Sequence, residues 1–283
     1  MALSIATNIA SLNAQRNLSV SQGQLAKSMQ RLSSGLRING ASDDAAGLAI
    51  SENMRGQIRS MNQATKNAND GVSLIQTAEG SLNETSAILV RMRELATQSA
   101  TGTVGSTERS YIQGEMNKLS SEIDRISNST EFNGQKLLNG TLSGGGGKVN
   151  SMTFQIGARN NQNNDTIDLN IKQADTKTLT GNATVNVSDQ TSAQKALDTL
   201  DAAIISISSE RSNLGATQNR LQSTINNLQV AVENTSASES RIRDVDVAAE
   251  TATMTRNNIL TQAGTAILSQ ANQAPQAALS LLR

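Results

Sequence analysis

The 283-residue sequence predicts a mainly α-helical protein: an elongated hairpin of long, antiparallel, coiled-coil-like helices with a small β-hairpin region at its tip. Proline occurs once, at Pro275, so nearly the whole chain is free to form long helices. Apolar residues recur at alternating intervals of four and three positions, which is the spacing of helices that pack side by side. Aromatic residues make up only 1% of the chain, and the abundant small and aliphatic side chains suit close packing between helices.

The N-terminal segment predicts a first helix. Its apolar stripe consists of Ile5, Ile9 and Leu12, continued after a phase shift by Leu18, Leu25, Met29, Leu32 and Leu36. Gly35, Asn39 and Gly40 then interrupt the helix, because glycine and asparagine favour turns over helix interiors.

Three more regular stripes predict the helices of the core. The stripe of about residues 43–100 consists of Met54, Ile58, Met61, Thr65, Ala68, Val72, Ile75, Leu82 and Leu89. A short helix carries Ile112, Met116, Leu119, Ile123 and Ile126. The stripe of about residues 192–242 consists of Leu200, Ile204, Ile207, Leu214, Leu221, Ile225, Leu228 and Val232. These stripes have partners within the chain, and burying one Leu or Ile contributes roughly 1.5–3 kcal/mol.

A weaker amphipathic stretch reaches the C-terminus through Met254, Ile259, Leu260, Ile267 and Leu268. Like the first helix, it is rich in Gln and Asn, and isolated helices of this kind are marginal in water. No acidic residue occurs in residues 1–42 or 251–283, and no ionisable side chain occurs between Asn257 and Leu282. We therefore expect both terminal helices to be loosely ordered in a single subunit and to need a partner.

The middle of the chain, about residues 131–190, changes to a turn-rich composition with two Asn-Gly pairs and a run of glycines at 144–147. Apolar residues alternate on either side of an Asn-rich turn, and they are Met152, Phe154 and Ile156, then Ile167, Leu169 and Ile171. This alternation predicts a β-hairpin. Because the flanking helices are antiparallel, the hairpin is expected at the tip, with both chain termini at the other end.

Several classes of function are excluded by composition. The net charge is zero, which gives no electrostatic footprint for nucleic acid or an anionic membrane. No apolar run approaches the roughly 18 residues of a membrane span, and the N-terminus lacks the charged region of a signal peptide. Cys and His are absent, which excludes disulfides, soft metal sites and His-based catalysis. The glycines before Lys148 do not match a phosphate-binding loop, because Leu142 and Val149 occupy required positions. We predict no enzymatic activity and no cofactor.

Pairs of aspartates stand where the helical periodicity is interrupted. Asp43 and Asp44 follow Arg37 closely, and Asp244 and Asp246 mark the second interruption. The pairs could form a carboxylate metal site, or they could cap helices and pair with basic residues. The second interpretation is favoured, because aspartate in the first helical turn interacts with exposed amides and the helix dipole. Arg37, Asp43 and Asp44 are therefore predicted to form a hinge.

Four long strings resemble signatures of bacterial flagellins. They are QRLSSGLRINGASDDAAGLAIS (30–51), RMRELATQSATGT (91–103), EIDRISNSTEFNGQKLLNG (122–140) and SRIRDVDVAAETATMTRNNILTQAGTAILSQANQAPQAALSLLR (240–283). The resemblance implies that residues 1–42 and 244–283 form an inner tube domain and that residues 43–243 form an outer rod, with the β-hairpin region at about 131–190. Only about 20 residues stand where many relatives carry large additional domains.

The resemblance implies a structural subunit of the extracellular flagellar filament, secreted unfolded through the flagellar type III apparatus. Paired terminal helices would then polymerise into a supercoiled helical propeller for motility. Filament-core assembly is assigned to Ile5, Ile9, Leu12, Leu18, Leu25, Leu32, Ile259, Leu260, Ile267 and Leu268. The implied partners are further copies of the chain, an export chaperone, the filament cap, the hook–filament junction proteins and, in animal hosts, Toll-like receptor 5. Arg91, Leu95 and Glu115 are the residues that the resemblance assigns to receptor binding.

Two alternatives remain beside the filament subunit. A hook–filament junction protein would share similar terminal helices and coaxial assembly, whereas the quoted strings favour the filament subunit. A coiled-coil adhesin would need a signal peptide or an anchor, and the sequence predicts neither.

Overall fold

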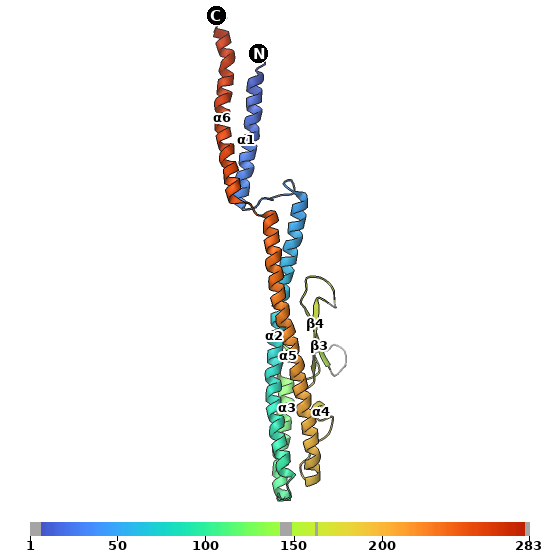
Figure 1. The fold of residues 1–283 in the computed structure, drawn as a ribbon. Coiled ribbons are helices and arrows are strands. Elements are labelled where there is room, and N and C mark those ends of the chain that lie inside the picture. Colours follow the sequence, from blue (N-terminus) through green and yellow to red (C-terminus); the bar gives the residue numbers. More distant parts are fainter. Residues whose placement is uncertain (1–6, 142–148, 162–163, 281–283) are drawn as a thin grey trace. The chain divides into compact units, whose positions relative to one another are not determined.

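The computed structural model describes residues 7–141, 149–161 and 164–280, with only the backbone described for residues 149–151 and 274–280. Within these ranges the chain forms six helices and two pairs of antiparallel strands (Figure 1). The helices are α1 (Ile9–Ser34), α2 (Ala45–Ser99), α3 (Ser106–Ser129), α4 (Thr176–Leu179), α5 (Gln190–Arg243) and α6 (Val247–Ser280). The predicted mainly α-helical fold, with long helices and a small amount of antiparallel β-structure, is confirmed.

The strands form two short hairpins. β1 (Glu131–Phe132) pairs with β2 (Gln135–Lys136), and Asn133 and Gly134 adopt the positive φ angles that a tight hairpin turn requires. β3 (Val149–Gln155) pairs with β4 (Thr166–Lys172) in a register that sets Phe154 opposite Ile167. The alternating apolar residues of β4 are buried, so the hairpin predicted from alternation is confirmed.

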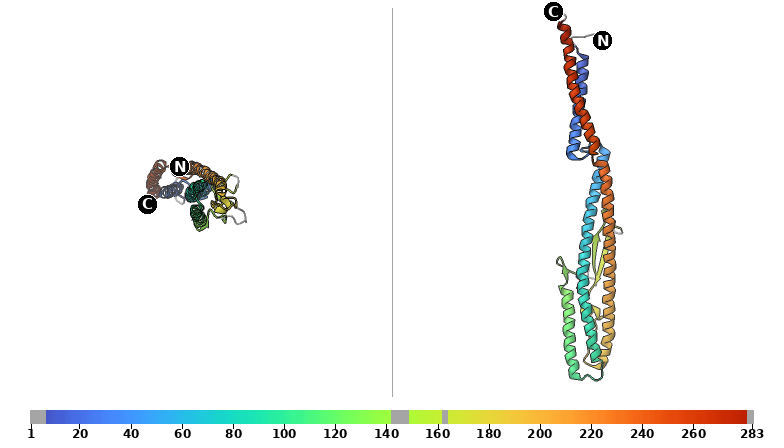
Figure 2. Two further views of the ribbon diagram at one scale, coloured as in Figure 1. Left: turned by 90° about the horizontal axis from the view of Figure 1, so that it is seen from below. Right: turned by 60° about the vertical axis from the view of Figure 1, so that its left-hand side comes forward.

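The β3–β4 hairpin lies alongside α2 and α5 and not at the tip where the sequence placed it (Figure 2). Gly71 of α2 makes this approach possible: a Cβ there would stand 3.2 Å from Leu221 of α5 and 3.3 Å from Phe154 of β3. Asn67 of α2 also donates a hydrogen bond to the carbonyl of Gln155 (3.0 Å). The apolar residues of the hairpin belong to the same hydrophobic core as those of the long helices. The turn at residues 100–105 joins α2 to α3 at the end where the hairpin was expected.

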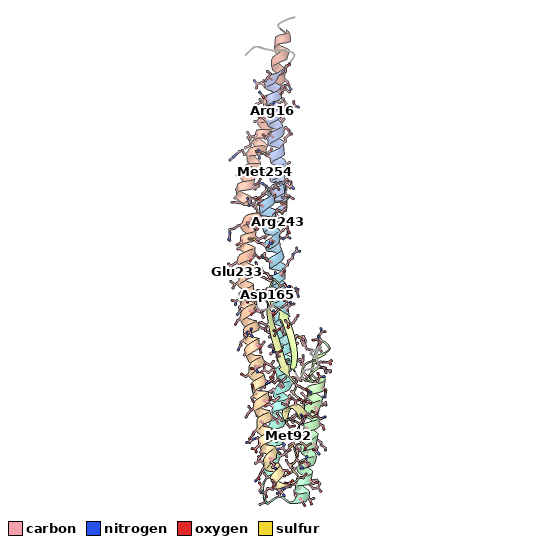
Figure 3. All side chains as sticks on the ribbon, turned by 90° about the vertical axis from the view of Figure 1, so that its right-hand side faces the viewer. Arg16, Met92, Asp165, Glu233, Arg243 and Met254 are labelled. Carbon is pink, nitrogen blue, oxygen red and sulfur yellow. The ribbon has the colours of Figure 1, made fainter. Side chains whose placement is uncertain are left out.

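The continuous hydrophobic core lies between residues 68 and 225. Its largest fully buried side chains include Ile75, Leu82, Leu89, Met92, Met116, Ile123, Leu137, Leu138, Leu169 and Ile171. Met92 of α2, labelled in Figure 3, is fully buried in this core. Glu210 is a buried exception, and its carboxylate accepts a hydrogen bond from the backbone N–H of Lys172 (3.1 Å), which ties β4 to α5. The stripes of α2, α3 and α5 thus form the core as predicted.

The chain divides into two compact units, residues 1–58 with 233–283 and residues 59–232. In the first unit α1 and α6 lie side by side and antiparallel, since Asn8 contacts Ala271 and Arg31 approaches Glu250. Both helices end at breaks where the sequence predicted interruptions, at residues 35–44 and 244–246. The assignment of residues 1–42 and 244–283 to a tube and 43–243 to a rod stays a prediction.

Candidate assembly surface on the terminal helices

The contact between α1 and α6, called the seam below, is built largely from small and polar side chains. On α1 it consists of Ser11, Ala14, Leu18, Ser21, Leu25, Ser28 and Leu32, and on α6 of Glu250, Met254, Asn257, Thr261, Gly264 and Leu268. These residues are buried or half-buried and recur every four and three positions, as in a two-stranded coiled coil. A coiled coil usually places Leu, Ile or Val at most of these positions, so the seam is a weak one.

Gly264 and Asn257 show how the seam is packed. Gly264 lets Leu18 approach, because a Cβ there would stand 3.2 Å from Leu18 Cδ1 and 3.7 Å from Leu18 Cβ. Asn257 is only 3% exposed, and its amide nitrogen has no hydrogen-bond partner. A buried amide without a partner costs about 1–3 kcal/mol. Asn257 therefore adds less to the stability of the seam than an apolar side chain would at the same position.

Large apolar side chains of the pair point away from the seam. Seven of them form what is called the outer face below, and they are Ile9, Leu12, Val20, Val247, Ile259, Leu260 and Ile267. Ile9 is 65% exposed and Ile259 is 60% exposed. Large apolar side chains exposed in this number make the terminal pair a candidate interaction site. None of the helices in the described ranges combines the length and apolar character needed to cross a membrane.

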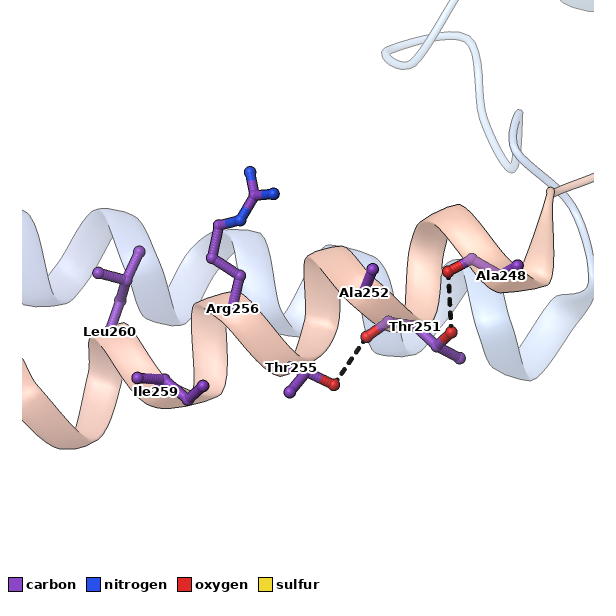
Figure 4. A pocket seen from close by; sticks show the side chains of 7 residues that line it. All are labelled: Ala248, Thr251, Ala252, Thr255, Arg256, Ile259 and Leu260. Carbon is purple, nitrogen blue, oxygen red and sulfur yellow. Dashed lines mark hydrogen bonds between the residues drawn. The ribbon is translucent and has the colours of Figure 1, made fainter.

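A shallow groove of about 570 Å³ runs along the outer face of α6 (Figure 4). Its lining consists of Ala248, Thr251, Ala252, Thr255, Arg256, Ile259 and Leu260. Thr251 and Thr255 donate their hydroxyl hydrogens to the carbonyls of Ala248 and Thr251 within the helix. Their polar groups are satisfied locally and their methyl groups are left to line the groove. Arg256 supplies the one charge among the lining residues.

The structure divides the predicted assembly residues into two groups. Ile9, Leu12, Ile259, Leu260 and Ile267 lie on the outer face, whereas Leu18, Leu25, Leu32 and Leu268 lie in the seam. Ile5 lies outside the described residues. Sequence reasoning missed Val20 and Val247, and it missed the small residues that make the seam.

The two segments that connect α1 to α2 and α5 to α6 are hydrogen-bonded to each other. Arg37 N–H donates to Arg243 O (2.6 Å), and Val245 N–H donates to Gly35 O (3.0 Å), around a bridge between Leu36 and Asp244. The Arg37 guanidinium also donates to the carbonyl of Ile242. Gly35 has a φ of 73°, the left-handed conformation that glycine adopts readily at a helix end. Both breaks are therefore ordered connections.

Asp44 and Asp246 cap helices as predicted, and Asp43 forms an ion pair with Lys27 and not with a neighbouring arginine. Asp44 accepts a hydrogen bond from Gly47 N–H (2.9 Å) in the first turn of α2, and Asp246 accepts from Ala248 and Ala249 N–H at the start of α6. Lys27 donates to Asp43 (2.7 Å), and this bond, with a second from Asn39 N–H, holds the pKa of Asp43 below its ordinary value. Among the residues whose side chains are described, no cluster of acidic residues could hold a metal ion.

A second ion pair lies at the same end of the unit. Arg243 donates to Glu52 (2.6 Å), and this hydrogen bond is the main reason that the pKa of Glu52 is lowered. Lys27–Asp43 and Arg243–Glu52 both depend on a carboxylate that stays ionised at neutral pH. A hinge motion at Arg37, Asp43 and Asp44 stays a prediction.

The residues assigned to receptor binding are only partly brought together. The Arg91 guanidinium donates to Glu115 across α2 and α3 (3.1 Å) and to Glu94 one turn along α2 (2.9 Å). These hydrogen bonds, that to Glu94 first, raise the pKa of Arg91. Leu95 is only 3% exposed and belongs to the hydrophobic core. Leu95 therefore offers no accessible side chain beside Arg91, and the assignment of Arg91, Leu95 and Glu115 to receptor binding stays a prediction.

Comparison with known proteins gives the same class of protein as the fold. The family model of the bacterial flagellin N-terminal helical region matches residues 5–143, and that of the C-terminal helical region matches residues 197–282. Flagellin of Halalkalibacterium halodurans is 49% identical over 277 residues, and flagellin of Bacillus subtilis is 50% identical over 305 residues. Each alignment covers 98% of both chains.

A solved structure described as a putative flagellar hook-associated protein from Vibrio parahaemolyticus has a similar fold. The TM-score is 0.58 at 15% identity, over 71% of this chain and 100% of that one. A likeness at this identity shows the fold alone, so it does not favour the hook–filament junction alternative.

Long helices, a weak terminal pair with an apolar outer face, and these matches define a structural protein of the bacterial flagellum. The chain belongs to the bacterial flagellin family and lacks a large outer domain. It is a structural subunit of the extracellular flagellar filament.

Proposed function

We propose that the subunits polymerise through the outer face of α1 and α6. The observation that carries this proposal is the exposure of large aliphatic side chains on the terminal pair, such as Ile9, Ile259 and Ile267, beside a seam in which Ser, Ala, Thr and Gly take many of the positions. Burial of each exposed Leu or Ile against a neighbouring copy would contribute roughly 1.5–3 kcal/mol if it were complete. A neighbour of the same chain suits the surface, because the outer face holds no acidic residue and little charge of any kind.

The interface between neighbours would be heterologous. A surface on one copy that binds a different surface on the next continues into an open helical polymer if the rotation does not close. Two discrete packings of the same interface would let the filament supercoil, as expected of a bistable packed contact. Motility as a helical propeller follows from this behaviour.

Export in an unfolded state is part of the same proposal. The absence of Cys means that no disulfide locks the fold before export. The weak seam keeps the terminal helices easy to unfold until neighbours bury their outer face. We propose an export chaperone, the filament cap and the hook–filament junction proteins as further partners that bind the terminal helices before or during assembly.

Removal of residues 257–283 tests the proposal. The truncated chain should keep the helices of residues 59–232, because the hydrophobic core lies between residues 68 and 225, and it should form no filaments after seeding. Circular dichroism measures the helix content and negative-stain microscopy detects filaments. A full-length variant with Ile259→Asn and Ile267→Asn separates loss of the outer face from loss of the helix, and it should fail in the same way. Normal filaments from either protein would contradict the proposal.

Recognition by Toll-like receptor 5 is a second proposed function of the free subunit. The support in the structure is the exposed cluster of Arg91, Glu94 and Glu115, in which one guanidinium bridges two carboxylates on neighbouring helices. Arginine and its partners recur among the residues that dominate binding energy in protein interfaces. Leu95 has no part in this proposal, since it is buried.

A further inference from the structure

Pro275 interrupts the hydrogen bonds of α6 without ending the helix, which continues to Ser280. In an α-helix each backbone N–H donates to the carbonyl four residues earlier. Proline has no N–H, so Ala271, four residues before Pro275, receives no such bond from its own helix. The carbonyl of Ala271 instead accepts a hydrogen bond from the side-chain amide of Asn8, with Asn8 Nδ2 at 2.7 Å.

The same asparagine begins α1. Asn8 is the N-cap of that helix, and its Oδ1 accepts a hydrogen bond from the backbone N–H of Ser11 (3.1 Å). A second contact follows one turn later, where the Ser11 hydroxyl donates to Asn272 Oδ1 (2.8 Å). The two ends of the Asn8 amide therefore serve different helices: the oxygen caps α1, and the nitrogen replaces the donor that Pro275 removes from α6.

The seam itself defines the register of α1 against α6 only weakly. Its residues repeat every seven positions, and Ser, Ala, Thr and Gly at many of them give few shape-specific contacts. In coiled coils of this kind, a polar group with one good partner fixes the register that apolar packing leaves open. Asn8 has such a partner, because only one carbonyl in α6 lies four residues before a proline.

We propose that Asn8 and Pro275 form a latch that sets the register of the two terminal helices and thereby aligns the outer face for assembly. In the latched register Asn8 faces Ala271 and Leu18 packs on Gly264, which brings Ile9 and Leu12 to the same end of the pair as Ile267. A slip of seven residues would keep residues of similar size along the seam, but it would misalign the outer face and break the Arg31–Glu250 pair and the hydrogen bond from Val245 to Gly35. The link to assembly rests on the proposed function, whereas the latch is a property of the single chain.

Disulfide formation measures the register directly, because the chain contains no native cysteine. A Cβ at Gly264 would stand 3.7 Å from Leu18 Cβ, within the Cβ separation of about 3.5–4.5 Å found in disulfides. The pair Leu18→Cys with Gly264→Cys reports the latched register. The pair Leu25→Cys with Gly264→Cys reports a slip of one heptad. Rates are measured in dilute full-length chain at a fixed concentration of oxidised glutathione, and their ratio is the readout.

Asn8→Asp separates the two roles of the side chain. Aspartate keeps the oxygen that caps α1, and its charge suits a helix N-terminus, so a residue that only capped the helix would tolerate the change. It loses the donor to Ala271, and the latch predicts that the ratio of the two rates falls about fivefold, as for the loss of one hydrogen bond. Pro275→Ala returns an N–H to α6, so the same substitution should then change the ratio less than about twofold.

Asn13→Asp is the matched control, since it makes the same change at an exposed position of α1, and it should leave the ratio unchanged. An unchanged ratio for Asn8→Asp would overturn the latch. The latch would also be overturned if Asn8→Asp lowered the ratio equally in chains with and without Pro275→Ala, because the effect would then be independent of the Ala271 carbonyl. Sedimentation of the unsubstituted chain is recorded separately: failure to polymerise would contradict the proposed function, while the rates in dilute chain would still decide the latch.

Discussion

Truncation of one outer-face side chain, Ile259→Ala, should weaken assembly without weakening the fold of the subunit. Ile259 is 60% exposed and lines the groove on α6, so the single subunit loses little buried area when the side chain is shortened. Alanine also has the higher helix propensity, by a few tenths of a kcal/mol. The melting temperature of the subunit should therefore stay the same or rise slightly.

The magnitude of the effect on assembly follows from the exposed fraction. The substitution removes three carbon groups, each worth about 0.8 kcal/mol when fully buried. Since 60% of the side chain is still exposed in the subunit, burial against a neighbour would recover about 1–1.5 kcal/mol of that amount. A difference of about 1.4 kcal/mol is a factor of ten in an equilibrium constant, so the critical concentration for polymerisation should rise about five- to tenfold.

Sedimentation of seeded subunits at a series of concentrations measures the critical concentration, and circular dichroism measures melting of the subunit. Ile205→Ala is the matched control, because Ile205 is 69% exposed and lies on α5 in the other compact unit. It should leave the critical concentration unchanged. An unchanged value for Ile259→Ala, or an equal rise for Ile205→Ala, would refute the assignment of assembly to the outer face.

Three further predictions concern the free subunit. Amides of residues 7–34 and 247–273 should exchange hydrogen quickly in the monomer and slowly in the filament. Amides around Ile75 and Leu221 should be protected from exchange in both states. Protection of the terminal helices in dilute monomer would contradict coupled folding and assembly. Because the pKa values of Asp43 and Glu52 are lowered in the fold, their ion pairs stabilise it fully above the ordinary carboxyl pKa, and this stabilisation is lost as the pH falls through the lowered pKa values. Hydrogen exchange at the amides of Arg37 and Val245, corrected for intrinsic rates, should therefore accelerate below about pH 4. The double variant Asp43→Asn, Glu52→Gln should show little of this pH dependence. Arg91→Ala combined with Glu115→Ala should lower signalling through Toll-like receptor 5 by the monomer at unchanged helix content, and full signalling would rule the receptor proposal out.

The ends of the long helices could be predicted from the sequence, because they depend on residues close to each end. The breaks at Gly35 and Asp244 were visible as an interrupted periodicity, and α2 and α5 each follow one uninterrupted stripe. The position of the β3–β4 hairpin was not readable, because it depends on contacts between distant residues. Gly71 admits Phe154 and Leu221 to the same place on α2, and nothing near Gly71 in the sequence indicates either neighbour.

The candidate site was partly readable, and its strongest signal was the phase shift in the first helix. Ile9 and Leu12 precede the shift and lie on the outer face, whereas Leu18, Leu25 and Leu32 follow it and lie in the seam. Met29, predicted in the same stripe as these leucines, is instead 57% exposed. Two apolar stripes on one helix indicate two packing partners, which are α6 of the same chain and, in our proposal, a neighbouring copy. The burial of Leu95 could not be predicted from its spacing. Residues four apart on a helix, such as Arg91 and Leu95, differ by about 40° around the helix axis, and here that difference separates an exposed residue from a buried one.

The small residues of the seam also explain why the terminal pair can be both exported and assembled. With larger aliphatic residues at half-buried seam positions such as Ser21, the pair would be closer to an ordinary coiled coil and more stable before any neighbour arrived. Such a pair would resist unfolding for export, and ordering it would no longer be coupled to polymerisation. Because Ile9, Ile259 and Ile267 face outward, part of the free energy that orders α1 and α6 would be released only when another copy covers them. Filling the seam at the half-buried Ser21 by Ser21→Leu should therefore stabilise the monomer's terminal helices and slow its export, while leaving the outer face able to polymerise in vitro.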